Sequence, residues 1–218
     1  MTIAIALFLA MIVAAFLIGS IPFGYVIGRW FYSTDLRGQG SGNIGAMNAL
    51  RTLGKTGGAA VLILDALKGF APTFYVATHL GGSVFGAIVA AAAVLGHCYS
   101  PWLGWKGGKG VATSFGAIFG LSWQAGLVAA VGWMLGALLT QYSSVGSIFG
   151  SALAPIALWV FTRSPAETLY GVFAAILILY THRENLGRLR AGTEGPIRLF
   201  KRRAHQGLPP PGPYLPKS

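Results

Sequence analysis

The sequence predicts an all-α integral membrane protein, a polytopic bundle of transmembrane helices. Of its 218 residues, 54% are hydrophobic and only 10% are charged, whereas soluble domains carry about a quarter charged residues. The mean hydropathy is +0.64, and apolar runs of bilayer-spanning length recur along the chain. The single cysteine, Cys98, excludes an intrachain disulfide and a CxxC zinc or redox motif.

The first apolar run covers residues 3–28, which is long enough to cross a bilayer with some tilt. It lacks the basic start, short apolar core and small-residue cleavage site of a signal peptide. We therefore expect a retained transmembrane helix, kinked near its inner end by Pro22. Six further crossings are expected, at residues 57–79, 83–100, 110–121, 123–141, 145–162 and 167–181.

The placement of charge sets the expected orientation. The 16 Lys and Arg against 5 Asp and Glu give a net charge of +11, and 14 of the 16 lie at residues 29–55, 106–109 and 183–217. Basic clusters between apolar spans favour the cytoplasmic side. All three clusters lie on that side only if the short run 110–121 crosses. The sequence thus predicts seven crossings, with the N-terminus outside and the C-terminus in the cytoplasm; its basic loops favour the lipid bilayer as partner over nucleic acid.

Composition divides the chain into two parts. Residues 1–200 hold all the apolar runs and are expected to form one membrane domain. Residues 201–218 are basic and too rich in proline for a helix. They are predicted to be a disordered cytoplasmic tail.

Three polar segments on the expected inner side need an explanation, because polar groups are costly in a membrane protein and mark function. The first, residues 37–51, reads RGQGSGNIGAMNALR. Its glycines let the backbone turn and present N–H groups to an anion. The guanidinium group of Arg51 is suited to binding a phosphate. The groups that could bind there are Ser41, Gly42, Asn43, Gly45, Asn48 and Arg51. A flexible glycine-rich loop is the alternative interpretation.

Residues 40–45 of this segment also match GxGxxG, with Asp65 twenty residues further on. A dinucleotide site needs that motif inside a βαβ unit, and here it lies between two membrane spans. This excludes a nucleotide cofactor on sequence grounds, and no other cofactor is indicated.

The second segment, residues 96–113, contains Lys-Gly-Gly-Lys-Gly at positions 106–110. Backbone amides, a helix N-terminus and two ammonium groups together favour anion binding, which makes candidates of Lys106, Gly107, Gly108, Lys109 and Gly110. A Walker A loop is excluded, because Leu103 takes its first glycine position and Gly110 stands where Ser or Thr must hold magnesium. A simple basic anchor at the membrane surface is the alternative.

The third segment, residues 181–194, follows the last span directly. On a continuing helix His182 and Asn185 share one face, as do Asn185 and Arg188. A histidine at the interface can act as a base or a hydrogen-bond donor near neutral pH. The alternative is a basic juxtamembrane helix.

Two further pairs of residues could form an ion pair or a metal site. Asp65 and Lys68 lie one turn apart inside a span and are expected to form a structural ion pair, with substrate contact as the alternative. The adjacent His97 and Cys98 have no convergent partners in the sequence, so no metal site is expected.

Together the segments favour a ligand with a phosphate at one end and a hydrocarbon chain at the other. A lipid-phosphate enzyme and a transporter of phosphate or of a phospholipid precursor both satisfy this pattern. A non-catalytic scaffold is a third class, for which alanine in the three segments would be tolerated.

In this order and spacing, the segments resemble the three motifs of the PlsY family, the acyl-phosphate-dependent glycerol-3-phosphate acyltransferases of bacteria. Residues 41–51, 96–113 and 182–194 look like the first, second and third motif, and the resemblance covers residues 15–195. Asp65 and Lys68 also fit a family pattern. Met47 departs from it, since the family commonly has threonine there.

The resemblance implies that residues 1–200 are an acyltransferase domain in the bacterial inner membrane, with the active site facing the cytoplasm. It implies transfer of a fatty acyl group from acyl phosphate to glycerol 3-phosphate, which gives lysophosphatidic acid and phosphate for phospholipid synthesis. Both substrates are then partners, and an upstream enzyme that forms acyl phosphate is a further one. The His-x4-Asp motif of other acyltransferases is absent.

We carry the family roles over as a hypothesis. Ser41, Arg51 and Lys109 hold phosphate groups, and the amides around Gly107, Gly108 and Gly110 cradle the acyl phosphate. His182 and Asn185 orient the glycerol hydroxyl, whose proton passes to His182 or to a substrate phosphate. Glu184 and Glu194 support the third motif through nearby arginines, and no acyl-enzyme on Cys98 is expected.

Overall fold

The computed structural model describes residues 2–197. In that range all the regular secondary structure is helical, and there are no strands. The all-α class is confirmed, whereas the tail predicted at 201–218 lies outside the described residues. The α-helices are α1 (Thr2–Ser20), α2 (Phe23–Tyr32), α3 (Ala46–His79), α4 (Gly82–Cys98), α5 (Val111–Leu121), α6 (Trp123–Thr140), α7 (Ser143–Thr162), α8 (Pro165–Thr181) and α9 (Arg183–Arg190); two 3₁₀ turns are η1 (Leu36–Gly38) and η2 (Pro101–Leu103).

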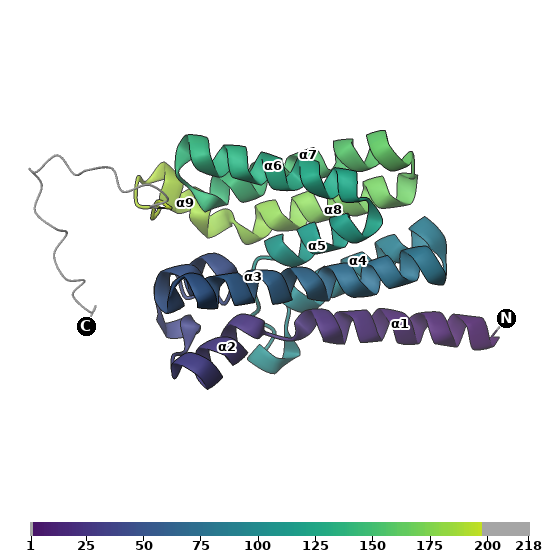
Figure 1. Ribbon diagram of the computed structural model, residues 1–218, viewed down its shortest axis with the longest axis horizontal. Coiled ribbons are helices and arrows are strands. Elements are labelled where there is room, and N and C mark those ends of the chain that lie inside the picture. The colour runs from purple at the N-terminus through teal and green to yellow at the C-terminus, as the bar shows by residue number, and fades with distance from the viewer. Residues whose placement is uncertain (1, 198–218) are drawn as a thin grey trace, which may run out of the picture.

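The long helices run side by side, and the chain reverses direction at each turn between them (Figure 1). Helices α1, α3 and α4 form one side of the bundle, α6, α7 and α8 form the other, and the short α5 lies between the two. One end of the bundle carries α2, α9 and the start of α3, and the N-terminus lies at the opposite end. The first and third polar segments therefore lie at the end with α2 and α9, and the second segment, which joins α4 to α5, lies further along the bundle (Figure 1).

The first apolar run is two helices rather than the single kinked one expected over 3–28. Helix α1 ends at Ser20, α2 begins at Phe23, and the two are bent by 40°. Pro22 has no N–H to continue the ladder of α1, which explains a break at this point. Beyond it α2 exposes Trp30 and Phe31.

Helix α3 starts at Ala46, well before the expected span at 57–79, and runs for 34 residues. Gly54 interrupts it with a left-handed backbone (φ 82°, ψ −172°), a conformation that glycine adopts without a steric penalty. Asn48 and Arg51 therefore stand on a helical turn and not in the glycine-rich loop that the sequence suggested.

Within residues 2–197, four helices are long and apolar enough to cross a membrane, and the bent pair α1–α2 makes a fifth span if it is counted as one. Helices α5 and α8 are apolar but shorter. At 1.5 Å per residue, α5 is roughly 16 Å long, about half of a hydrocarbon core. The protein is a polytopic membrane protein by this criterion, and the predicted seven crossings stay a prediction.

Helix α5 lies unusually close to α3. A Cβ at Gly69 of α3 would collide with the carbonyl of Thr113, and one at Gly116 of α5 would collide with that of Ala66. Small residues allow such close approach of membrane helices. This packing fixes the first turn of α5, where the second polar segment enters the bundle.

Candidate active site

The second and third polar segments are joined by a continuous network of hydrogen bonds. The ammonium of Lys109, just before α5, donates to Asn185 Oδ1 of α9. Asn185 Nδ2 donates to Glu194 Oε1 at 2.6 Å. Arg188 Nε lies 2.7 Å from Glu194 Oε2 and forms an ion pair with it. Residues more than 70 positions apart in sequence thus form one polar cluster.

Glu194 is the fixed acceptor at the centre of this network. The hydroxyl of Ser144, in the first turn of α7, also donates to Glu194 Oε1, at 3.0 Å. Burial of Glu194 opposes its ionisation, but the hydrogen bonds from Asn185, Arg188 and Ser144 outweigh that effect and hold its pKa below the usual value. Glu194 is therefore an anion that orients Asn185 towards Lys109.

The segment after α9 closes over the same end of the bundle. Arg51 Nη2, on α3, donates to the carbonyl of Gly195 at 2.9 Å. The amide of Ile197 donates to the carbonyl of Gln141, between α6 and α7, at 2.6 Å. The first motif is tied in this way to the residues that follow Glu194.

His182 stands between α8 and α9 and is buried, with 4% of its surface exposed. Its Nδ1 is 2.8 Å from the carbonyl of Ile178. Because a carbonyl only accepts, Nδ1 carries the proton and Nε2 is left as an acceptor. Burial, and then the charge of Lys109, lower the pKa of His182 to about 4, so the ring is neutral at physiological pH.

Lys109 is held in place from both sides. Thr181 Oγ1, at the end of α8, donates to the carbonyl of Lys109 at 3.0 Å. Gly110 has φ +83° and caps α5. Burial first, and then the charge of Arg188, lower the pKa of the Lys109 ammonium. The side chain is thus a partly desolvated cation whose interaction with an anion is strengthened.

The N-terminus of α5 lies directly beside Lys109. The backbone amide of Ser114 donates the first hydrogen bond of the helix, to the carbonyl of Gly110 at 2.8 Å. The amides of residues 111–113 precede that bond and have no partner within the helix. An N-terminal turn of this kind favours an anion.

The amides of Gly107 and Gly108 have a different role from the one expected. They donate to the carbonyls of Cys98 and His97, both at 3.0 Å, so they are used inside the protein and do not cradle a phosphate. What glycine provides here is space, because a Cβ at Gly108 would collide with the His97 ring. The sequence could not show this, since it depends on how the end of α4 meets the 106–110 segment.

Asn48 organises the first motif. Its Nδ2 donates to the carbonyls of Leu36, Gln39 and Asn43 at 3.1, 3.0 and 2.8 Å. Its Oδ1 accepts from the amide of Ser41 at 3.1 Å. This holds the Ser41 side chain at the surface of a fixed turn, in which Gly42 adopts φ +70°.

Asn43 also has a local role in the first motif. Its Oδ1 accepts from the amide of Gly45 at 2.8 Å, just before α3. Gly45 is the residue that caps α3, and it has an extended backbone. Both residues thus shape the start of α3.

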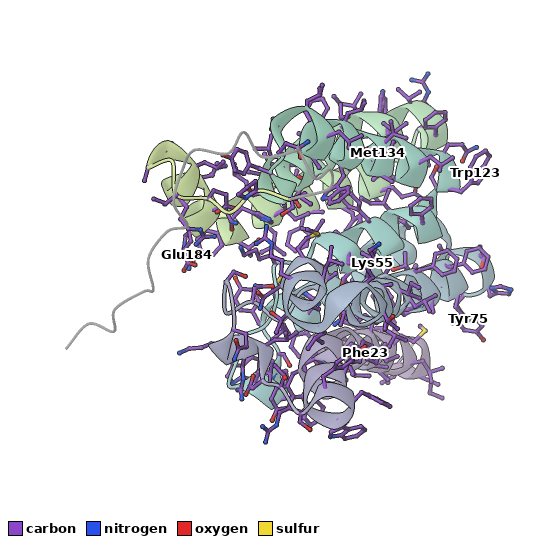
Figure 2. The ribbon with its side chains drawn as sticks, turned by 60° about the vertical axis from the view of Figure 1, so that its left-hand side comes forward. Phe23, Lys55, Tyr75, Trp123, Met134 and Glu184 are labelled. Carbon is purple, nitrogen blue, oxygen red and sulfur yellow. The ribbon has the colours of Figure 1, made fainter. Side chains whose placement is uncertain are left out.

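Lys106 and Glu184 are candidates that take no part in the network. The side chains of Lys106 and Glu184 are exposed, and Figure 2 shows Glu184, a residue of α9, at the periphery. The ion pairs found among residues 2–197 do not include Glu184. Of the two glutamates expected to support the third motif through arginines, only Glu194 does so.

Asp65 and Lys68 form the expected ion pair inside the bundle, with 2.7 Å between Lys68 Nζ and Asp65 Oδ1. Both side chains are 2% exposed, so the pair has no access to a soluble substrate. His97 Nδ1 lies 3.6 Å from the same carboxylate oxygen. Within the described residues, no group of three or more His, Cys, Asp or Glu could hold a metal.

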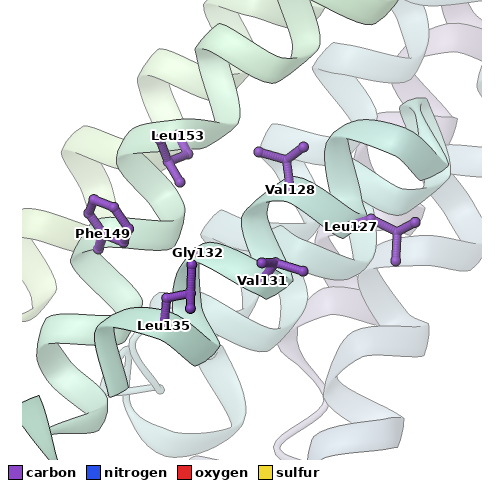
Figure 3. A pocket seen from close by; sticks show the side chains of 7 residues that line it. All are labelled: Leu127, Val128, Val131, Gly132, Leu135, Phe149 and Leu153. Atoms are coloured by element: carbon purple, nitrogen blue, oxygen red, sulfur yellow. The ribbon is translucent and has the colours of Figure 1, made fainter. Parts of the chain in front are cut away.

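An apolar hollow of about 330 Å³ lies between α6 and α7 (Figure 3). It contains none of the network residues. Its lining is Leu127, Val128, Val131, Gly132, Leu135, Phe149 and Leu153.

Sequence reasoning missed three partners of the network. Ser144 lies in the first turn of α7 and Gln141 follows the end of α6, and Gly195 takes part through its carbonyl. A serine at a helix start and a backbone carbonyl carry no sequence signal of such a role.

Comparisons with known proteins agree on one family. A family model described as Glycerol-3-phosphate acyltransferase matches residues 9–192. Glycerol-3-phosphate acyltransferase 2 of Thermotoga maritima is 42% identical over 190 residues, which cover 87% of this chain and 96% of that protein. Glycerol-3-phosphate acyltransferase of Rhodopseudomonas palustris (strain BisB5) is 44% identical over 193 residues, which cover 88% of this chain and 97% of that protein.

Two solved structures have the same fold. They are crystal structures of PlsY (YgiH), an integral membrane glycerol 3-phosphate acyltransferase. The glycerol 3-phosphate form has a TM-score of 0.83 at 38% identity, and the lysophosphatidic acid form 0.80 at 37%; each match covers 87% of this chain and 94% of the other. With the family match spanning most of the sequence, the chain belongs to the glycerol-3-phosphate acyltransferase family of integral membrane enzymes.

Proposed function

We propose that this protein transfers a fatty acyl group from acyl phosphate to the sn-1 hydroxyl of glycerol 3-phosphate, giving lysophosphatidic acid and inorganic phosphate. Membership of an acyltransferase family sets aside the transporter and scaffold alternatives. The two forms of the neighbouring structure support the acceptor and the product. The three motif segments support acyl phosphate as donor, and an enzyme that forms acyl phosphate is then the upstream partner.

In this reaction the hydroxyl oxygen forms a bond to the acyl carbonyl carbon, and the bond from that carbon to the phosphate oxygen breaks. Nε2 of His182 is the acceptor available to hold the hydroxyl, because Nδ1 donates to Ile178. A histidine with a pKa of about 4 is a weak base, whereas a phosphate monoester takes a proton near pH 6. The proton of the hydroxyl therefore ends on a phosphate group. His182 orients the hydroxyl and passes its proton on to that phosphate.

The charges of the phosphate groups are met by Lys109, Arg51 and the first turn of α5. Lys109 is aimed by Asn185 and Glu194, and Arg51 by the carbonyl of Gly195. Ser41 adds a hydroxyl from the turn that Asn48 fixes. Groups held in advance of the reaction stabilise developing charge without reorganisation, and positioning supplies much of the rate.

The polar end of the bundle faces the cytoplasm of a bacterial cell in this proposal, and the protein resides in the inner membrane. The helices α1, α3, α4, α5, α6, α7 and α8 supply seven crossings, with the N-terminus outside. Support comes from the gathering of α2, α9 and the start of α3 at one end (Figure 1), because these helices carry the basic residues Arg29, Arg51, Arg183, Arg188 and Arg190.

The observation that carries the proposal is the single network through Lys109, Asn185 and Glu194, which joins two motifs distant in sequence. The test uses purified protein in detergent with palmitoyl phosphate, with and without glycerol 3-phosphate. We expect phosphate release only when glycerol 3-phosphate is present, together with palmitoyl lysophosphatidic acid.

A parallel reaction with palmitoyl-CoA tests the donor. Turnover with palmitoyl-CoA and none with palmitoyl phosphate would contradict the donor and keep the acyltransferase. No turnover with either, in protein shown to be folded by its thermal unfolding curve, would contradict the proposed function.

A further inference from the structure

We propose that Asp65, Lys68 and His97 form a positioning cluster that holds the connection between α4 and α5, residues 99–110, and thereby sets Lys109 and the start of α5. The proposal rests on the function proposed above, because its readout is that reaction. The three side chains lie inside the bundle and do not touch substrate; they act through the backbone that carries the phosphate-binding groups.

The cluster is closed to solvent on all sides. The side chains of Asp65, Lys68 and His97 are 2%, 2% and 3% exposed. Ion pairs inside a membrane protein are expensive to bury, and their cost is offset only by close partners. Here Asp65 Oδ1 is shared, 2.7 Å from Lys68 Nζ and 3.6 Å from His97 Nδ1. These distances place a carboxylate between two nitrogen groups from different helices, α3 and α4.

On one side the cluster secures the break between α1 and α2. Lys68 Nζ donates to the carbonyl of Ile21 at 2.7 Å, a group that the break at Pro22 removes from the helical ladder. The ammonium also lies 5.6 Å from the centre of the Phe23 ring, which is the first residue of α2 (Figure 2).

The same break is held by the 99–110 connection itself. Ser100 Oγ donates to the carbonyl of Ser20 at 2.7 Å, and Trp102 Nε1 donates to Ser20 Oγ at 2.8 Å. The α1–α2 break, α3 and the start of the connection are thus linked through these hydrogen bonds.

On the other side the cluster meets the Lys-Gly-Gly-Lys-Gly segment. The carbonyl of His97 accepts from the amide of Gly108 at 3.0 Å. A Cβ at Gly108 would lie 2.8 and 3.0 Å from Cε1 and Cδ2 of the His97 ring, which is closer than real contacts allow. The ring therefore lies flush against the backbone one residue before Lys109. Asp65 Oδ1 lies 3.6 Å from Nδ1 on one edge of this ring, and the opposite edge lies against Gly108 of the connection.

The test is a double-mutant cycle between His97 and Gly108, measured as kcat/KM with palmitoyl phosphate and glycerol 3-phosphate. His97→Ala removes the support, and Gly108→Ala drives a methyl group into the ring, so we expect each to lower kcat/KM at least tenfold. The double variant has room for the methyl group, and it should be no slower than the slower single variant. The coupling between the two sites is then at least tenfold.

The matched control pairs His97→Ala with Gly187→Ala, because a Cβ at Gly187 of α9 meets nothing within 4 Å. Those two effects should multiply. If the losses of kcat/KM from His97→Ala and Gly108→Ala also multiplied in the double variant, the proposal would be overturned. His97→Asn removes Cε1 and Nε2, the ring atoms that the methyl group would meet first, and replaces His97→Ala if that variant does not fold.

A second readout separates positioning from general stability. Lys109→Met should raise the KM of one substrate more than that of the other, and His97→Ala should raise the KM of that same substrate. A His97→Ala protein that unfolds at lower temperature but keeps both KM values contradicts the proposal. The wild-type enzyme is measured first: its failure to turn over would count against the proposed function, whereas turnover without coupling counts against the positioning cluster alone.

Discussion

His182 is the residue whose ionisation state the structure defines most clearly. Its burial and the nearby Lys109 lower its pKa to about 4, compared with about 6.5 for an ordinary histidine. We predict that the ratio of kcat/KM for wild type over His182→Gln is flat between pH 8 and pH 5.5. Using the ratio cancels the ionisation of the substrates themselves.

An ordinary histidine would lose about nine tenths of its neutral form over that interval, so a roughly tenfold fall in the ratio would contradict the assignment. The lowered pKa of His182 also makes the stability of the folded protein depend on pH. The unfolded chain binds the proton more readily than the folded one, so folding loses stability as the pH falls from about 6.5 towards about 4.

At the residue scale the sequence identified most of the groups but not their partners. Lys109, Asn185 and Glu194 were all predicted for one site, and their pattern of contacts required the structure. The amides of Gly107 and Gly108 were misassigned because whether an amide is free depends on tertiary hydrogen bonds, here with the end of α4. His97 gave no sequence signal of its link to Asp65, since 32 positions separate them.

At the scale of elements, the turn before α3 depends on a single side chain. Asn48→Asp removes the donor of three hydrogen bonds to backbone carbonyls. Carbonyls left without partners in a buried turn should cost about 2 to 4 kcal/mol, which corresponds to a fall of roughly 5 to 15 °C in Tm for a chain of this size. Thermal unfolding in detergent measures it.

Gln39→Ala is the matched control for this turn. The Gln39 side chain is exposed, and Asn48 bonds to the backbone carbonyl of Gln39 and not to its side chain. The Tm of the Gln39→Ala variant should therefore stay within about 2 °C of wild type. A similarly small change for Asn48→Asp would show that the turn does not depend on Asn48.

The helices themselves were largely predictable, and their boundaries were not. Hydropathy finds the part of a helix that lies in the bilayer, so it placed the start of α3 at residue 57 and missed the polar turns that begin at Ala46. It likewise placed one helix over residues 3–28, because Pro22 interrupts the hydrogen bonding without interrupting the apolar run. The short α5 needed the charge argument, since its 11 residues carry no spanning signal by length.

At the scale of the whole molecule, the predicted orientation can be read by labelling. In intact cells, a membrane-impermeant maleimide should label Ser83→Cys, in the first turn of α4. It should label Arg190→Cys, at the end of α9, only after the membrane is opened. Cys98 is buried and stays in both variants as an internal background.

The reverse pattern, with Arg190→Cys labelled from outside, would contradict a cytoplasmic site. Labelling of both positions in intact cells would contradict an odd number of crossings between them. The sequence predicted this orientation from charge alone, because basic residues bias loops to the cytoplasmic side whatever the packing.

The division of the chain at residue 200 is a second prediction at this scale. Ile197, the last residue that the structure describes, still bonds to Gln141, and the family match ends at residue 192. A chain that ends at Phe200 should keep kcat/KM within about twofold of the full chain in the phosphate-release assay. A chain that ends at Thr193 lacks Glu194 and should lose at least tenfold; a large loss from the first truncation would show that residues 201–218 belong to the enzyme domain.

The central claim is that the network through Lys109, Asn185 and Glu194 is the centre of acyl transfer. The most direct measurement is the rate of lysophosphatidic acid formation by Lys109→Met, with Arg183→Gln as the control, since the exposed Arg183 contacts the carbonyl and the ring of Tyr180 and is not part of the network. Removing a preorganised charge from a reaction centre costs about 10² to 10³ in rate. We predict a loss of that size for Lys109→Met and less than about threefold for Arg183→Gln; equal rates for Lys109→Met and wild type would place the reaction elsewhere in the molecule.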